Sequence, residues 1–155
     1  MPTKKLTKTG ARTLPKSLVE KSLVDKVDLF AIGLDALNAN LDRSNYALAY
    51  AEDKKRIKRS VESTYNVTDY SDEHFDVTGK LFLRVEAAGF QNPILSLDIA
   101  VTGHFHPKRT VSRDEAGRFA RAEARLIFWP YFRQIVSDTT GRMHVGAITL
   151  PLAVS

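Results

Sequence analysis

The sequence predicts an α+β domain in which an antiparallel sheet carries its helices on one side. Strand-type alternation of apolar and polar residues occupies much of residues 57–105. One long helical pattern follows over residues 113–138, and the last residues are extended and apolar. Strands that precede helices in this way are typical of α+β rather than α/β domains. With 155 residues and 43% apolar composition, the chain is long enough to bury one core.

Three segments show the period-two alternation of half-buried strands. They cover residues 57–67, 75–88 and 95–105. A short Gly/Asn/Pro-containing turn at residues 89–93 joins the second segment to the third, which predicts an antiparallel hairpin. The polar residues 70–74 are predicted as a turn.

A long helix is predicted after the strands. Ser112 is expected to cap it, with Glu115 completing a capping box. Apolar residues recur every three or four positions and predict one buried stripe, formed by Phe119, Ala122, Leu126, Trp129, Phe132 and Val136. Pro130 cannot bond to the Leu126 carbonyl, so the helix is predicted to kink or restart there. Gly141 is predicted as the C-terminal cap.

The N-terminal part of the chain has no clear helix or strand pattern. Residues 22–37 and 41–51 are ambiguous between helix and strand. Residues 1–22 contain six lysines and arginines and one glutamate, so the whole net charge of +5 lies there. We interpret residues 1–22 as a basic, disordered leader and residues 23–155 as a single domain. Such a leader could touch nucleic acid, although the neutral body argues against this.

The composition excludes several classes of protein. The absence of cysteine excludes a disulfide framework, a thiolate zinc site and a cysteine nucleophile. No apolar run approaches the roughly 18 residues of a membrane span, and no secretory h-region follows the N-terminal lysines. We therefore expect a cytoplasmic protein that does not insert into membranes.

Candidate chemical groups are few. His104 and His106 could face one side of a strand, but a metal site would need a third ligand such as His74 or His144. Solvent-facing histidines are the favoured interpretation, so no metal and no cofactor are predicted. The candidate residues for general acid–base catalysis are Asp72, Glu73, Asp98, Asp114 and Glu115. Nothing in the sequence indicates that these carboxylates converge in a cleft. No phosphate loop or nucleophile elbow is present, so we predict that the protein is not an enzyme.

The segment Leu126–Val136 concentrates aromatic bulk. Phe128, Trp129, Tyr131 and Phe132 surround the helix, and one core face cannot bury them all. We infer oligomerisation through this helix. The neighbouring arginines, Arg113, Arg118, Arg121 and Arg125, alternate with acidic residues and are interpreted as a solvated face.

The segment Leu126–Val136, Gly141-Arg142 and the ending Ala147–Leu152 resemble the C-terminal half of the SecB chaperone family. The likeness is strongest to the SecB-like branch that serves toxin–antitoxin systems. Residues 65–88 resemble the second strand of the family, residues 95–105 resemble its third, and residues 24–37 are candidates for the first. The resemblance covers roughly residues 56–152.

The resemblance implies a four-stranded antiparallel sheet with the long helix packed on one face, assembled as a dimer of dimers. It implies an ATP-independent holdase for unfolded or disordered segments, in protein export or for an antitoxin client. On strand and helix position, client contacts are expected at Tyr65, Val67, Phe82, Phe105 and Phe128. Trp129, Tyr131 and Phe132 are expected in the helix core or the subunit interface.

Two departures from the family count against docking to the SecA motor. Export members are acidic and end in a second helix and a tail, whereas this chain is basic to neutral and stops at Ser155. The alternative function is a nucleic-acid-binding or regulatory module that uses the leader and the basic run 54–59.

Overall fold

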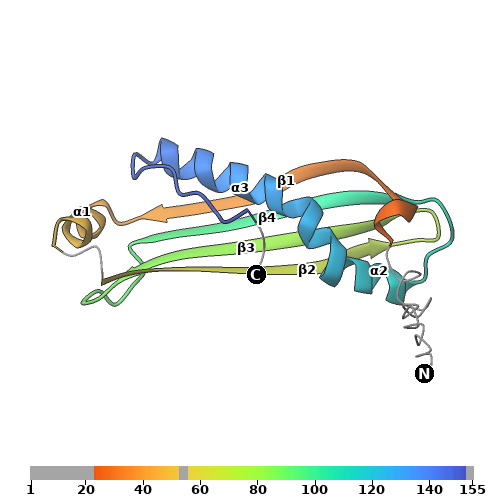
Figure 1. Ribbon diagram of the computed structural model, residues 1–155, viewed down its shortest axis with the longest axis horizontal. Coiled ribbons are helices and arrows are strands. Elements are labelled where there is room, and N and C mark those ends of the chain that lie inside the picture. The colour runs from red at the N-terminus through yellow and green to blue at the C-terminus, as the bar shows by residue number, and fades with distance from the viewer. Residues whose placement is uncertain (1–22, 53–55, 153–155) are drawn as a thin grey trace, which may run out of the picture.

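The computed structural model describes residues 23–52 and 56–152 (Figure 1). The predicted leader, residues 1–22, and part of the basic run therefore lie outside the described residues. In chain order the elements are η2 (Val24–Lys26), β1 (Val27–Leu41), α1 (Arg43–Glu52), β2 (Ile57–Tyr70), β3 (Phe75–Ala87), β4 (Leu95–Pro107), α2 (Arg113–Phe119), η4 (Ala120–Ala124) and α3 (Arg125–Arg142). No helix in these ranges is long and apolar enough to cross a membrane.

The four strands form one antiparallel sheet in the order β1-β4-β3-β2, which confirms the predicted fold class. The predicted hairpin is β3–β4, with Phe75 opposite Phe105 and Val85 opposite Leu95. β1, Val27–Leu41, takes in most of the ambiguous residues 22–37 and reaches the first residue of the ambiguous range 41–51. Register shifts between Leu29 and Ala31, and between Leu34 and Ala36, move its apolar residues out of period two.

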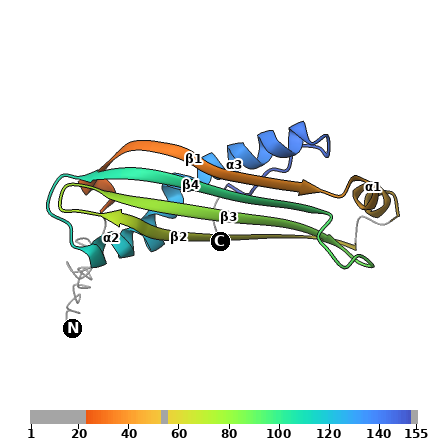
Figure 2. The same ribbon diagram turned by 180° about the vertical axis from the view of Figure 1, so that it is seen from behind.

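One face of the sheet is covered by the long helix and the C-terminal segment (Figure 1). Odd-numbered residues of β3, and of β4 as far as Phe105, face this layer and are buried, as the alternation predicts. Figure 2 shows the opposite face, which no described helix covers. The residues that β3 and β4 place on this face are mostly polar. Hydroxyl contacts cross it from Thr68 to Thr78 (3.1 Å) and from Thr78 to Thr102 (2.6 Å).

The capping box is confirmed. The Ser112 hydroxyl accepts from the Glu115 amide at 3.2 Å, and the Glu115 carboxylate accepts from the Ser112 amide at 2.8 Å. Arg109 donates to the same carboxylate at 2.7 Å. These hydrogen bonds lower the pKa of Glu115 to about 2, and the bond from Arg109 has the largest effect.

The helix covers residues 113–142, and four of the six residues of the predicted stripe are buried: Phe119, Trp129, Phe132 and Val136. The other two, Ala122 and Leu126, are exposed. The remaining buried residues, Ala116, Ala120, Ala124, Phe128 and Thr140, lie with Phe132 and Val136 on a spacing of four. This spacing is wider than 3.6 residues per turn, and the π-helical segment η4 absorbs part of the difference because its bonds run from i to i+5.

The helix does not restart at Pro130. Pro130 is exposed and lies inside α3, and Leu126 is also exposed, so water can reach the Leu126 carbonyl that Pro130 leaves without a donor. The departure from α-helical geometry lies upstream, in η4.

The prediction that Gly141 caps the helix is wrong, because α3 continues through it. His144 instead adopts the left-handed conformation with φ of 59°. Its amide donates to the Gly141 carbonyl at 3.1 Å, and the Val145 amide donates to the Thr140 carbonyl at 3.5 Å. This is a Schellman cap with a histidine in the position that glycine usually fills.

Candidate functional site

A cavity of about 300 Å³ lies between the edge strand β2 and the first half of the long helix. We call it the β2 groove. It is lined by Tyr65, Asn66, Val67, Arg113, Asp114, Gly117, Ala120 and Arg121. Because β2 is an edge strand, alternate backbone amide and carbonyl groups point away from the sheet beside this cavity.

The groove has an apolar base and a charged rim. Tyr65 and Ala120 are buried and Val67 is half-buried, whereas Arg113 and Arg121 are exposed. The small residue at position 117 lets the Arg121 guanidinium approach the helix, and Nη1 lies 3.4 Å from the position that a Cβ would occupy there. Such a surface suits an extended peptide with apolar side chains and backbone carbonyls.

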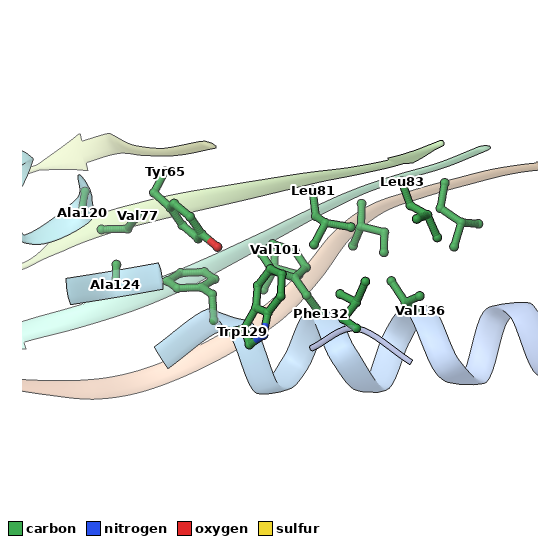
Figure 3. Packing of buried hydrophobic residues seen from close by; sticks show 14 of the residues in the cluster. Tyr65, Val77, Leu81, Leu83, Val101, Ala120, Ala124, Trp129, Phe132 and Val136 are labelled. Carbon is green, nitrogen blue, oxygen red and sulfur yellow. The ribbon is translucent and has the colours of Figure 1, made fainter. Parts of the chain in front are cut away.

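Tyr65 joins the groove to the core. Its ring centroid lies 5.9 Å from that of Phe128 and 6.4 Å from that of Phe132. Figure 3 shows the tyrosine hydroxyl pointing toward the helix layer. That hydroxyl is buried without a hydrogen-bond partner, and burial raises the pKa of Tyr65. Because this oxygen is buried on the side of the helix layer, the groove is offered the ring edge of Tyr65 rather than its hydroxyl.

Two glycines make room for these rings. A Cβ at Gly79 would lie 3.1 Å from atoms of both Tyr65 and Phe128. A Cβ at Gly103 would lie 3.0 Å from Phe128 and 3.0 Å from Phe105. The sheet is therefore hollowed beneath Phe128, which fixes the depth at which the helix and Tyr65 sit.

The structure separates the five residues that were expected to contact clients. Tyr65 and Val67 line the β2 groove. Phe105 and Phe128 are 0% exposed, so neither side chain is available to a client in this conformation. Phe82 lies on the opposite face of the sheet, next to Arg84, whose guanidinium carbon is 5.8 Å from the ring centroid.

The three aromatic residues expected in the helix core or an interface also divide. Trp129 and Phe132 are buried in the core. Tyr131 is 39% exposed on α3, as is Leu126 to 61%. Sequence reasoning missed Gly117 and Ala120 as groove residues, because small residues give no signal until the side of the helix is known.

The histidines pair with carboxylates on the polar face. Nδ1 of His104 lies 2.8 Å from Asp76, and Nε2 of His74 lies 3.3 Å from Asp69. The His74 and His106 ring centroids are 6.2 Å apart. Within residues 23–52 and 56–152, no group of three or more His, Asp or Glu side chains could hold a metal ion.

The candidate acidic residues do not share a cleft. Asp72 and Glu73 are exposed in the β2–β3 turn, and Asp98 pairs with Arg84 at 2.6 Å on the polar face. Asp114 lines the β2 groove on the other side of the sheet. The described residues therefore bring no pair of these acids together for proton transfer.

Comparison with known proteins identifies the fold of the chain through a solved structure, not through a sequence match. No protein-family model and no curated protein sequence matches the chain. A solved structure that does match is the Mycobacterium tuberculosis Rv1957 SecB-like chaperone, in complex with a ChAD peptide from the Rv1956 HigA1 antitoxin. It aligns over 84% of this chain and 93% of its own with a TM-score of 0.68 and 21% identity. A Streptococcus agalactiae protein of unknown function aligns over 81% of this chain and 97% of its own, with a TM-score of 0.45 and 10% identity. The four-stranded sheet and its long helix therefore have the SecB-like fold.

Proposed function

We propose that the protein is an ATP-independent chaperone that holds unfolded or disordered polypeptide segments in the β2 groove. The observation that carries this proposal is the combination in one place of an edge strand, an apolar base and a rim with two arginines. An enzyme would need converging reactive groups, whereas a holdase needs only this surface.

The groove accounts for weak sequence selectivity. An extended client pairs its backbone with the free edge of β2 and places alternate apolar side chains on Tyr65 and Val67. Arg113 and Arg121 at the rim attract carbonyl or carboxylate oxygens of the client. Binding that favours the unfolded client then delays its folding or aggregation by mass action.

The SecB-like structure bound to an antitoxin peptide supports a disordered antitoxin segment as one kind of client. Service in protein export is the other setting that we propose. In both settings the protein acts in the cytoplasm without catalysing a reaction.

We also propose assembly of the chain as a dimer of dimers, in which the edge of β1 joins two copies. β1 is 15 residues long and contains no lysine, arginine or proline. Natural edge strands usually carry such residues to prevent pairing. A strand without them is suited to pair with a second copy, and the exposed Leu126 and Tyr131 on α3 offer further apolar contact.

Aggregation of reduced insulin chains tests the chaperone function. The wild-type protein is expected to suppress light scattering at a stoichiometric ratio, and Val67→Asp is expected to lose most of this effect. Val61→Asp is the matched control, because Val61 is 38% exposed on the same side of β2 but lies outside the groove. A wild-type protein that leaves scattering unchanged would refute the proposal.

A further inference from the structure

Residues 145–152, which follow the helix, contact the rest of the domain as a bound peptide would, through backbone hydrogen bonds and buried side chains. This segment forms no helix or strand and runs back beside α3 (Figure 1). Side chains of α1 and α3 donate hydrogen bonds to its backbone carbonyls. The Tyr46 hydroxyl donates to Val145 at 3.1 Å, Arg133 Nε to Leu150 at 3.0 Å, and Trp129 Nε1 to Pro151 at 2.8 Å.

The side chains of the segment alternate in burial. Ile148 is 5% exposed and Leu150 is 2% exposed, and both belong to the same apolar cluster as Tyr65. The intervening Thr149 and the flanking Ala147 are exposed. This is the pattern of an extended chain in which every second side chain packs into an apolar surface.

The segment also leads toward the β2 groove. Its first residue is held at α1, and Pro151 is held by Trp129, one turn before Phe132, whose ring lies 6.4 Å from that of Tyr65. Tyr65 itself lines the groove. The surface under the segment and the open groove are therefore two stretches of one apolar track beside the helix.

We propose that residues 145–152 are an internal ligand of this track, and that an extended client segment with apolar residues at alternate positions displaces them. This inference rests on the proposed function. Tyr46, Arg133 and Trp129 recognise main-chain carbonyls, which every polypeptide offers, so they can serve a client as they serve the segment. Two buried side chains anchor the segment, so a client with similar side chains replaces its contacts one for one.

Occupancy by the segment lowers the apparent affinity for clients by the fraction of protein in which the track is free. Burial of a leucine side chain contributes a factor of roughly 10 to 100 to an equilibrium constant. Leu150→Ser is therefore expected to free the track and to tighten client binding by roughly 10- to 100-fold. Leu152→Ser is the matched control, because Leu152 is 82% exposed.

The probe is a labelled peptide with the sequence of residues 145–152, VGAITLPL, measured by fluorescence anisotropy against each full-length protein. Leu150→Ser is expected to bind it far more tightly than the wild type and Leu152→Ser, and a peptide with aspartate at its fourth and sixth positions is expected not to bind. Equal affinity of the wild type and Leu150→Ser would overturn the proposal. Circular dichroism shows whether the variant folds.

Thr140→Val gives a second route if Leu150→Ser fails to fold. The Thr140 hydroxyl is buried and accepts from the Ile148 amide at 2.8 Å, so valine releases the segment while keeping the volume. Tighter peptide binding and faster hydrogen exchange at the Ile148 amide are expected. No change in either measurement would overturn the proposal.

Reduced, carboxymethylated α-lactalbumin separates this inference from the proposed function. If the unfolded protein binds Leu150→Ser more tightly than the wild type, both stand. If it binds both proteins equally, clients do not compete with the segment and the inference fails alone. If it binds neither while the peptide binds Leu150→Ser, the internal ligand stands and the chaperone function fails.

Discussion

Replacement of Gly103 by alanine tests the close approach of the helix to the sheet. Gly103 lies on β4 and faces the helix layer, where its Cβ would be 3.0 Å from Cζ of Phe128 and 3.0 Å from Cε2 of Phe105. Both side chains are fully buried, so neither ring can move aside into solvent. We expect Gly103→Ala to lower the free energy of unfolding by about 1–3 kcal/mol through overpacking, although alanine usually suits a strand better than glycine.

A double-mutant cycle with Phe128→Leu isolates the contact. Leucine lacks the Cζ atom that the new methyl group would meet, and Phe128→Leu alone is expected to cost about 1–3 kcal/mol through lost packing. In that background the methyl group of alanine at position 103 fills part of the vacated space. The two changes together should therefore cost at least about 1 kcal/mol less than their sum.

Urea unfolding followed by far-UV circular dichroism measures all four proteins. One protomer concentration is used throughout, because assembly makes apparent stability depend on concentration. Gly33→Ala is the matched control, since no atom lies within 4 Å of the Cβ position at this strand glycine. Additivity within about 0.5 kcal/mol would refute the argument that Gly103 exists to seat Phe128.

Two further predictions concern the ends of the helix. Hydrogen bonds from Arg109 and Ser112 depress the pKa of Glu115 to about 2, below its unfolded value of about 4.3. Their stabilisation is complete above the unfolded pKa and is lost as pH falls toward 2. Glu115→Gln should therefore have a lower free energy of unfolding than the wild type in urea at pH 7, and the difference should narrow at pH 2.5. A difference that is the same at both pH values would contradict this. His144→Gly should raise the free energy of unfolding by about 0.5–1 kcal/mol, because φ of 59° strains a residue with a Cβ; a lower thermal midpoint would count against it.

Sequence reasoning succeeded where local pattern alone decides the structure. Alternation placed Tyr65 and Val67 on the side of β2 that faces the helix, and spacing identified the Ser112 capping box. It failed where backbone irregularity changes the period. Two register shifts hid β1, and beside the π-helical turn two of the six predicted stripe residues, Ala122 and Leu126, are exposed while Ala124 and Phe128 are buried. Neither irregularity has a residue signature, because both arise from fitting one element against another.

The same limit applies to the groove. Arg113 and Arg121 are visible in the sequence as part of a charged helix face, and Tyr65 is visible as an inward strand residue. Their meeting depends on where the helix crosses the sheet, and the contact of η4 with β2 sets that crossing. The C-terminal segment was expected to be extended, but its attachment to Trp129 and Arg133 depends on their positions along α3.

The two edges of the sheet suit different partners, and this difference makes the proposed assembly compatible with the proposed client site. Along β1, Leu29, Leu34 and Leu37 are 36%, 51% and 42% exposed, although their partners on β4 are buried beneath the helix. The helix therefore leaves an apolar strip uncovered beside an unprotected edge, which is the surface that a second copy would bury. β2 instead carries Lys58 and Arg59 near its start and borders the groove farther along. Because β1 and β2 are opposite edges of the sheet, pairing of two copies through β1 does not itself occupy the β2 edge that borders the groove.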